Sequence, residues 1–516
     1  MTYKRLTLND FHFGNTDAKN ELLTYSPQEI RRFTDSFVTP PSLSVPKFLT
    51  KEKYYVVGLK GTGKTALLRY ISISLEEREN SICKFVLFKS QIDEDTRKGF
   101  ANAVRVQLVE ENSQSFEGND FETIWRWLIY KKIAQTIRED NVKTFQNNNT
   151  LSQFLSLVET KTDDENNGFS KLIPKIRRGQ VKISRTPHLQ LDLEWDHEEK
   201  AKIKFNDLVR KADHFFEQLE PDTQRLNIFF DELELNYETK KKFQRDTQLV
   251  RDLIVSVEKI NALAKSKGIE LCLYAAIRSE VLTSIHSLGK EINKPIGDFG
   301  ATILWNRPGL SAAQQPLLSI IEKRINAARV ENELPPLSSQ EVWEQYFPEE
   351  IHGKTPEIYI LHNTWYRPRD IVRLLISIQD QYPDNTEFDI QSLETVRKTY
   401  STSSWVELTE ELKTKYQSQE IDGIKYIFYG FRQILTFSEI ETRSKKAADD
   451  YTDVYELLKK HKLKDVLKDL FRIGVIGNIN TNRNRMRFSF RGDDEILFNL
   501  NIFVHNALKA HLSIFD

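Results

Sequence analysis

Three glycines and two side chains with ligand chemistry stand close together near residue 60. The apolar run 54–57 leads into the pattern Gly-x-x-x-x-Gly-Lys-Thr, which ends in Lys64 and Thr65. Glycines let such a segment curl until its backbone amides converge on phosphate oxygens. The lysine would neutralise the outer phosphates, and the threonine hydroxyl would bind a magnesium ion that arrives with them. The predicted phosphate contacts are Gly58, Gly61, Thr62, Gly63, Lys64, Thr65 and Ala66.

A second apolar run, 226–230, ends in the two carboxylates Asp231 and Glu232. Asp231 is the predicted second magnesium residue, beside Thr65. Glu232 would lie farther from the metal and polarise the attacking water as a general base. Alternatively, Glu232 is a surface ion-pair residue at the end of a strand. Together with the glycine segment, the pair predicts binding and hydrolysis of a nucleoside triphosphate.

The elements that must position these residues follow an alternating pattern. The runs 54–57, 84–88, 226–230 and 270–277 are short and apolar, as expected of strands buried on both faces of a parallel sheet. The segments 65–79 and 250–266 have apolar residues at helical spacing. Strand, crossover helix and strand in this order predict an α/β fold around a parallel sheet.

The glycine segment and the acidic strand end resemble the Walker A and Walker B motifs of P-loop ATPases of the AAA+ and STAND branch. Within it, the chain is similar to origin-recognition-type ATPases and to bacterial stand-alone P-loop ATPases that begin with a Phe-x-Phe-Gly-like segment, here Phe11-His12-Phe13-Gly14. The resemblance covers the layout of most of the chain, but only the Walker motifs are specific. It implies ATP and Mg²⁺ as cofactors. ATP is favoured over GTP because no Asn-Lys-x-Asp motif follows the later strands.

The resemblance also implies two arginines that sense the terminal phosphate. Arg278 directly follows the run 270–277, where a cation would stand beside the triphosphate. Arg278 could instead pair with Glu280 or cap a helix. Arg369 is the second candidate, because Pro368 would fix the start of the helix that carries it. A purely structural role for Arg369 is the alternative, and no arginine finger is assigned because Arg245, Arg251 and others are available.

Changes of pattern along the chain predict four parts. An irregular arm, 1–50, is expected to pack on the next domain. A P-loop NTPase core, 51–300, carries a β-hairpin insertion near 161–199. A helical lid spans 301–420, and a winged-helix-like domain with a strand over 486–490 spans 421–516. Its cationic turn carries Arg483, Arg485 and Arg487, which could contact double-stranded DNA. The alternatives are a contact with a protein and a hairpin that is only solvated.

Bulk composition excludes several protein classes. The chain has 516 residues, 39% of them hydrophobic, and a formal charge of −1, so any nucleic-acid contact must come from a local basic face. With only two cysteines, Cys83 and Cys272, the chain does not fit a disulfide scaffold. It contains no run of about 18 apolar residues, the length that a membrane span needs. A cytoplasmic protein is expected.

The predicted function is a magnesium-dependent ATPase switch that couples nucleotide state to a DNA or protein partner or to homo-oligomer formation. The resemblance adds a possible setting in bacterial defence. The alternative is a nucleotide-gated DNA- or protein-binding scaffold with little hydrolysis of its own.

Overall fold

The computed structural model describes residues 6–22, 24–79, 81–91, 97, 121–159, 180–184, 200–233, 235, 240–285, 292–413, 415–480 and 485–515. The chain divides into two compact units. The sheet unit comprises Leu43–Gly58 and Lys64–Thr302. The helical unit comprises Met1–Ser42, Leu59–Gly63 and Ile303–Asp516. The tip of the glycine segment thus groups with residues far along the chain.

A five-stranded parallel sheet forms the centre of the sheet unit. Its order is β2-β5-β6-β1-β7, and each neighbouring pair runs parallel. The strands β1, β5 and β6 are buried along most of their length, as expected of the central strands of such a sheet, whereas β2 and β7 are mostly half-buried. The bounds of the five strands are β1 Tyr55–Gly58, β2 Ile82–Leu87, β5 Leu226–Leu233, β6 Leu271–Arg278 and β7 Gly300–Thr302.

Helices pack on the strands of this sheet. The helix α3 (Lys64–Glu79) follows β1 and contacts β1, β2, β5 and β6, whereas α9 (Lys240–Lys267) crosses over from β5 to β6. The remaining helices that border the strands are α2 Val45–Leu49, α4 Phe88–Gln91, α10 Ser279–Ile285 and α11 Asn293–Phe299. The predicted strand-helix-strand order is therefore present.

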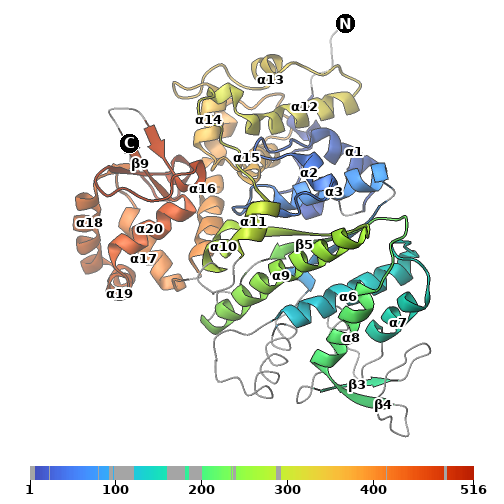
Figure 1. The fold of residues 1–516 in the computed structure, drawn as a ribbon. Helices are drawn as coiled ribbons and strands as arrows, with labels where there is room; N and C mark the ends of the chain where they lie inside the picture. Colours follow the sequence, from blue (N-terminus) through green and yellow to red (C-terminus); the bar gives the residue numbers. More distant parts are fainter. Residues whose placement is uncertain are drawn as a thin grey trace. The chain divides into compact units, whose positions relative to one another are not determined.

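A helical cluster with a hairpin is inserted between β2 and β5. Figure 1 shows α6 (Glu122–Asp140), α7 (Asn149–Val158) and α8 (Phe205–Glu217) next to this hairpin. Its strands, β3 (Gln180–Ser184) and β4 (Lys200–Lys204), pair antiparallel. An insertion hairpin was predicted near 161–199; its second strand lies just beyond that range, and residues 160–179 and 185–199 lie outside the described residues.

The N-terminal arm contains ordered helices and contacts the helical unit. It forms η1 (Leu8–Asp10), η2 (Ala18–Leu22) and α1 (Pro27–Ser36). The Leu8 amide donates to the Asn385 carbonyl at 2.7 Å, and Phe11 packs edge-on against Tyr346. The arm 1–50 was predicted to be irregular and to pack on the next domain. Its described residues up to Ser42 instead form helices that group with the helical unit, whereas α2 at its end packs on α3. The Phe48 carbonyl accepts from the Tyr274 hydroxyl of β6.

Helices dominate residues 303–428, a region that includes most of the predicted lid, 301–420. After the short turns η5 (Ala312–Gln314) and η6 (Pro316–Leu318) come six α-helices. Pro368 begins α15, and the preceding Arg367 is extended, as expected before a proline. These helices are α12 Ser319–Glu331, α13 Ser339–Tyr346, α14 Pro356–His362, α15 Pro368–Gln381, α16 Ile390–Leu412 and α17 Ser418–Phe428.

The C-terminal part combines helices with a four-stranded sheet of order β10-β9-β11-β8. The predicted antiparallel pair is β9 (Ile476–Asn480) with β10 (Arg485–Arg487). The predicted strand 486–490 is wrong at its end, because Ser489–Arg491 turns into a 3-10 helix (η7) that Gly492 closes with a positive φ. The other elements are β8 Ile434–Leu435, β11 Asn501–Val504, η8 Asn506–Leu508, α18 Phe437–Asp450, α19 Thr452–Lys460 and α20 Leu463–Ile473.

The predicted fold class is confirmed: the chain is α/β, with a parallel sheet core and a helical C-terminal region. None of the described helices is long and apolar enough to cross a bilayer.

Candidate functional site

The glycine segment joins β1 to α3 by a tight loop. Gly61 and Gly63 have φ values of +79° and +94°, which favour glycine. Gly58 lies in β1 without a positive φ, so the curl needs only the two later glycines. The Lys64 ammonium donates to the Gly58 carbonyl at 2.9 Å, which folds the side chain back over the loop. Thr62 is buried, and Ala66 lies half-buried in the first turn of α3.

Asp231 lies at the carboxyl end of β5 and is 3% exposed. Burial raises the pKa of this carboxyl, and the neighbouring Thr65 hydroxyl, Glu232 amide and Lys64 ammonium oppose the rise. Its Oδ1 accepts the Glu232 amide at 2.8 Å, while Oδ2 has no hydrogen-bond partner among the described residues. A buried carboxylate oxygen without a donor is costly unless a cation binds it. The residues present therefore fit a magnesium ion held by Asp231 and Thr65.

Glu232 has a strained backbone. Its φ is +57°, in the left-handed region that glutamate rarely adopts, and the pairing of β5 with β6 shifts between Phe230 and Leu233. A bulge of this kind redirects a side chain that would otherwise alternate with its neighbours. Such strain persists where surrounding structure enforces it, and it is concentrated at functional sites. Glu232 therefore differs from an ordinary residue at a strand end in its left-handed backbone and in the shifted strand pairing around it.

Arg278 ends β6, the strand that lies between β1 and β5. Its backbone is in register with Gly58, the last residue before the loop. The guanidinium Nη1 lies 3.6 Å from Glu280 Oε1. The ion pair with Glu280 that the sequence left open is therefore formed. The parallel strands bring Gly58, Asp231 and Arg278 to one edge of the sheet, where ligands bind in such folds.

Arg369 contacts the loop through its backbone. Its amide donates to the Gly61 carbonyl at 3.3 Å, and a Cβ on Gly61 would lie 3.2 Å from Arg369 Cβ. Its guanidinium donates to the Thr16 carbonyl at 2.8 Å and to Glu407 at 2.9 Å. Arg367, two residues earlier, is 4% exposed, and its Nε has no hydrogen-bond partner among the described residues. The same helix start therefore offers two arginines to the loop.

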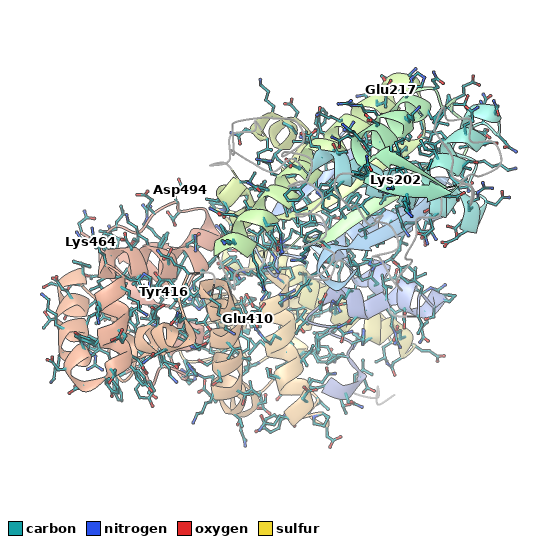
Figure 2. All side chains as sticks on the ribbon, turned by 90° about the horizontal axis from the view of Figure 1, so that it is seen from below. Lys202, Glu217, Glu410, Tyr416, Lys464 and Asp494 are labelled. Atoms are coloured by element: carbon teal, nitrogen blue, oxygen red, sulfur yellow. The ribbon has the colours of Figure 1, made fainter. Side chains whose placement is uncertain are left out.

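Lys60 and Glu407 belong to the same cluster, although no sequence pattern indicated them. Glu407 Oε1 lies 2.9 Å from Arg369 Nη1 and 3.8 Å from Lys60 Nζ, and Oε2 pairs with Arg373. Burial alone would raise the pKa of Glu407, but Arg373, Arg369 and Lys60 outweigh it and lower the pKa to about 2. Lys60 also pairs with Glu410 at 2.9 Å, the residue labelled in Figure 2. One ionised carboxylate thus links a loop lysine to two lid arginines.

The arginines of the predicted wing are partly engaged within the protein. Arg487 pairs with Asp493 at 3.2 Å, and Arg491 stacks on the Tyr366 ring at 4.9 Å. Arg483 lies outside the described residues, and Arg485 lies in β10. Of the arginines left open as trans fingers, Arg245 and Arg251 are buried against the aspartate that follows each.

Comparison with known proteins gives a match to a protein family and matches to solved structures. Residues 315–409, which contain Arg367, Arg369 and Glu407, match a family described as the FunZ-associated C-terminal helical domain. Among solved structures, the chain is similar to Cdc6p from Pyrobaculum aerophilum with a TM-score of 0.29 and 10% identity, covering 93% of this chain and 98% of that one. None of the curated proteins matches the sequence.

Proposed function

We propose that this chain is a magnesium-dependent ATPase switch of the AAA+/STAND type. The observation that carries the proposal is the buried Asp231 carboxyl, which lies beside the Thr65 hydroxyl and whose Oδ2 has no hydrogen-bond partner of normal geometry among the described residues. In the proposed complex, amides of residues 58–66 bind the phosphates, and Asp231 and Thr65 hold the magnesium ion. When bound, that ion neutralises charge on the phosphate oxygens.

Each remaining residue has a separate role in the proposal. Lys64 leaves the Gly58 carbonyl and pairs with the outer phosphates. Glu232 orients the attacking water and accepts its proton. Arg278, at the same edge of the sheet, and Arg369 or its neighbour Arg367 respond to the charge of the terminal phosphate.

The proposed output runs through the segment 365–369, which leads into α15. The Trp365 indole donates to the Gly474 carbonyl at 2.8 Å and stacks on His505 at 4.2 Å. Arg491 donates to the Tyr366 hydroxyl at 3.2 Å. These contacts tie the start of α15 to the C-terminal domain, so a movement of the arginines around phosphate would shift that domain. Its partner, DNA or protein, would then be bound or released.

Steady-state phosphate release, with binding of labelled ATP measured in parallel, tests the proposal. We expect Lys64→Ala to lose binding, and Glu232→Gln to retain binding but lose about 10²-fold or more in turnover. Binding without release by the parent protein would support the scaffold alternative instead. Equal turnover in the parent and both variants would contradict the assignment of the site. Phage challenge of cells that carry the parent or the Lys64→Ala gene would test a role in defence.

A further inference from the structure

The outer side of the phosphate loop is held by hydrogen bonds to its carbonyl groups. The Trp305 indole Nε1 donates to the Thr62 carbonyl at 2.9 Å, and the Arg369 amide donates to the Gly61 carbonyl at 3.3 Å. Thr62 and Trp305 are both buried, so water does not compete freely for the indole bond. Two consecutive carbonyls of the loop are therefore fixed from the side of the helical unit.

Fixing these carbonyls also fixes the amides that follow them. Across a trans peptide bond, the carbonyl of one residue and the amide of the next point in opposite directions, and none of the described peptide bonds is cis. With the Thr62 carbonyl turned toward Trp305, the Gly63 amide must point to the opposite, inner side of the loop. Gly63 supplies the amide of this peptide, and without the indole bond its permissive backbone would let the peptide rotate at lower cost than another residue would.

The segment that carries Trp305 is itself braced. The Leu304 amide donates to the Ser42 hydroxyl at 2.9 Å. The buried Gln315 side chain accepts from the Arg307 amide and donates to the Arg307 carbonyl, each at 3.0 Å. Hydrogen bonds therefore hold the backbone before and after Trp305. They keep the indole N–H in position for the Thr62 carbonyl.

We infer that Trp305 is a positioning residue for phosphate binding: its indole N–H keeps the loop in the conformation whose amides face the polyphosphate. This inference rests on the proposed nucleotide site and adds a residue that acts through the loop without touching the ligand. One peptide earlier, the α15 amide of Arg369 holds the Gly61 carbonyl. The Thr62 amide of that peptide donates within the loop to the Leu59 carbonyl at 3.4 Å. Pro368 has no amide hydrogen, so the Arg369 amide is the first donor that α15 offers, and the Gly61 carbonyl satisfies it.

Trp305→Phe removes the donor and keeps most of the buried ring. We expect it to weaken binding of magnesium-ATP about two- to tenfold, the effect of one lost hydrogen bond. Magnesium tripolyphosphate, which lacks base and sugar, should lose affinity by the same factor, because the defect lies in the loop amides. Titration calorimetry measures both ligands on the full chain.

Trp343→Phe is the matched control, because this buried indole donates to Glu322 at 3.0 Å within the same unit and away from the loop. It should leave both affinities unchanged. If Trp305→Phe does not fold, Gln315→Met tests the same brace and should weaken tripolyphosphate in the same direction. A parent that binds while Trp305→Phe binds equally well overturns the inference. A parent that binds neither ligand overturns the proposed function instead.

Discussion

The carboxylate of Asp231 is retained at a cost to stability. Its folded-state pKa lies above the ordinary value because burial disfavours the charged form. The folded protein therefore holds this proton more tightly than the unfolded chain. The free energy of unfolding therefore falls as the pH rises from the ordinary pKa of aspartate to the higher pKa of folded Asp231. Above the folded pKa it stays at the lower value. A residue that weakens the fold at neutral pH needs a compensating role, which a bound cation would supply.

Asp231→Asn should therefore raise the free energy of unfolding of the nucleotide-free protein at neutral pH, while magnesium-dependent ATP binding is lost. The gain should shrink as the pH falls below the folded pKa and vanish below the ordinary pKa, where the parent carboxyl is neutral in both the folded and the unfolded state. Urea unfolding over a pH series measures this. The control is Asp246→Asn, because Asp246 is also buried but pairs with Arg97 and Arg245. This variant should lose about 3–5 kcal/mol of the free energy of unfolding. Destabilisation by Asp231→Asn at neutral pH would contradict the cation site.

Glu407 sets the charge beside the loop. It is one negative charge against Lys60, Arg369 and Arg373. Glu407→Gln removes that charge while keeping the side-chain shape, so the cations attract polyphosphate more strongly, and ATP affinity should rise severalfold. The gain should shrink as salt is added. Fluorescent-nucleotide titration at several ionic strengths measures the change.

Glu410→Gln is the control for that prediction, because Glu410 is 52% exposed and pairs with Lys60 through solvent-accessible atoms. An exposed pair contributes little, so the affinity should change by less than about twofold. If Glu407→Gln instead lowers the affinity for ATP, the prediction is wrong, and the main role of Glu407 is to hold Arg369 and Lys60 in place for phosphate.

One of the contacts between the segment before α15 and the C-terminal domain is made at a glycine, Gly474, against the Trp365 indole. Gly474 has a φ of +85°, and a Cβ there would lie 2.8 Å from Trp365 Cδ1. Gly430 also has a positive φ, +62°, but a Cβ there would meet nothing within 4 Å. Gly474→Ala should therefore cost about 1–3 kcal/mol more than Gly430→Ala, because only the first change displaces a packed indole. Chemical unfolding of both variants measures the difference. Equal losses would show that Trp365 gives way without cost.

Elements with a local pattern could be predicted from the sequence, and those defined by their partners could not. The runs 54–57 and 226–230 and the helix 65–79 were found because apolar periodicity and glycine punctuation are local. The strand β7, Gly300–Thr302, has three residues, and β8 has two, so neither carries a period. They exist because β1 and β11 offer unpaired backbone groups beside them.

The site divides in the same way. The loop from Gly58 to Thr65 and the pair Asp231-Glu232 are contiguous motifs, which a sequence reveals directly. The contacts of Trp305 and Glu407 with the loop span more than 200 residues and involve residue types that have no motif of their own. The left-handed φ of Glu232 depends on the bulge between β5 and β6, which pairing alone determines.

Because Leu59–Gly63 group with the helical unit while β1 and α3 belong to the sheet unit, ligand binding at the loop should affect segments of both. We predict that a slowly hydrolysed ATP analogue with magnesium slows amide hydrogen exchange at 58–66 and 226–233 and also at 303–315 and 365–373. A ligand at about a hundredfold above its Kd stabilises the folded form by about 2.7 kcal/mol, enough to slow opening of these segments.

The hairpin strands β3 and β4 serve as the internal control for that experiment, since they pair with each other and β4 packs on α8. Their exchange should not change. Lys64→Ala should abolish every effect, because no phosphate is held. Protection confined to 58–66 and 226–233 would mean that the loop carbonyls bonded to Trp305 and Arg369 do not transmit the bound state. Protection that reaches 303–315 and 365–373 would support a response of these helical segments to nucleotide, either through the loop hydrogen bonds of Trp305 and Arg369 or through contact of Arg367 or Arg369 with phosphate.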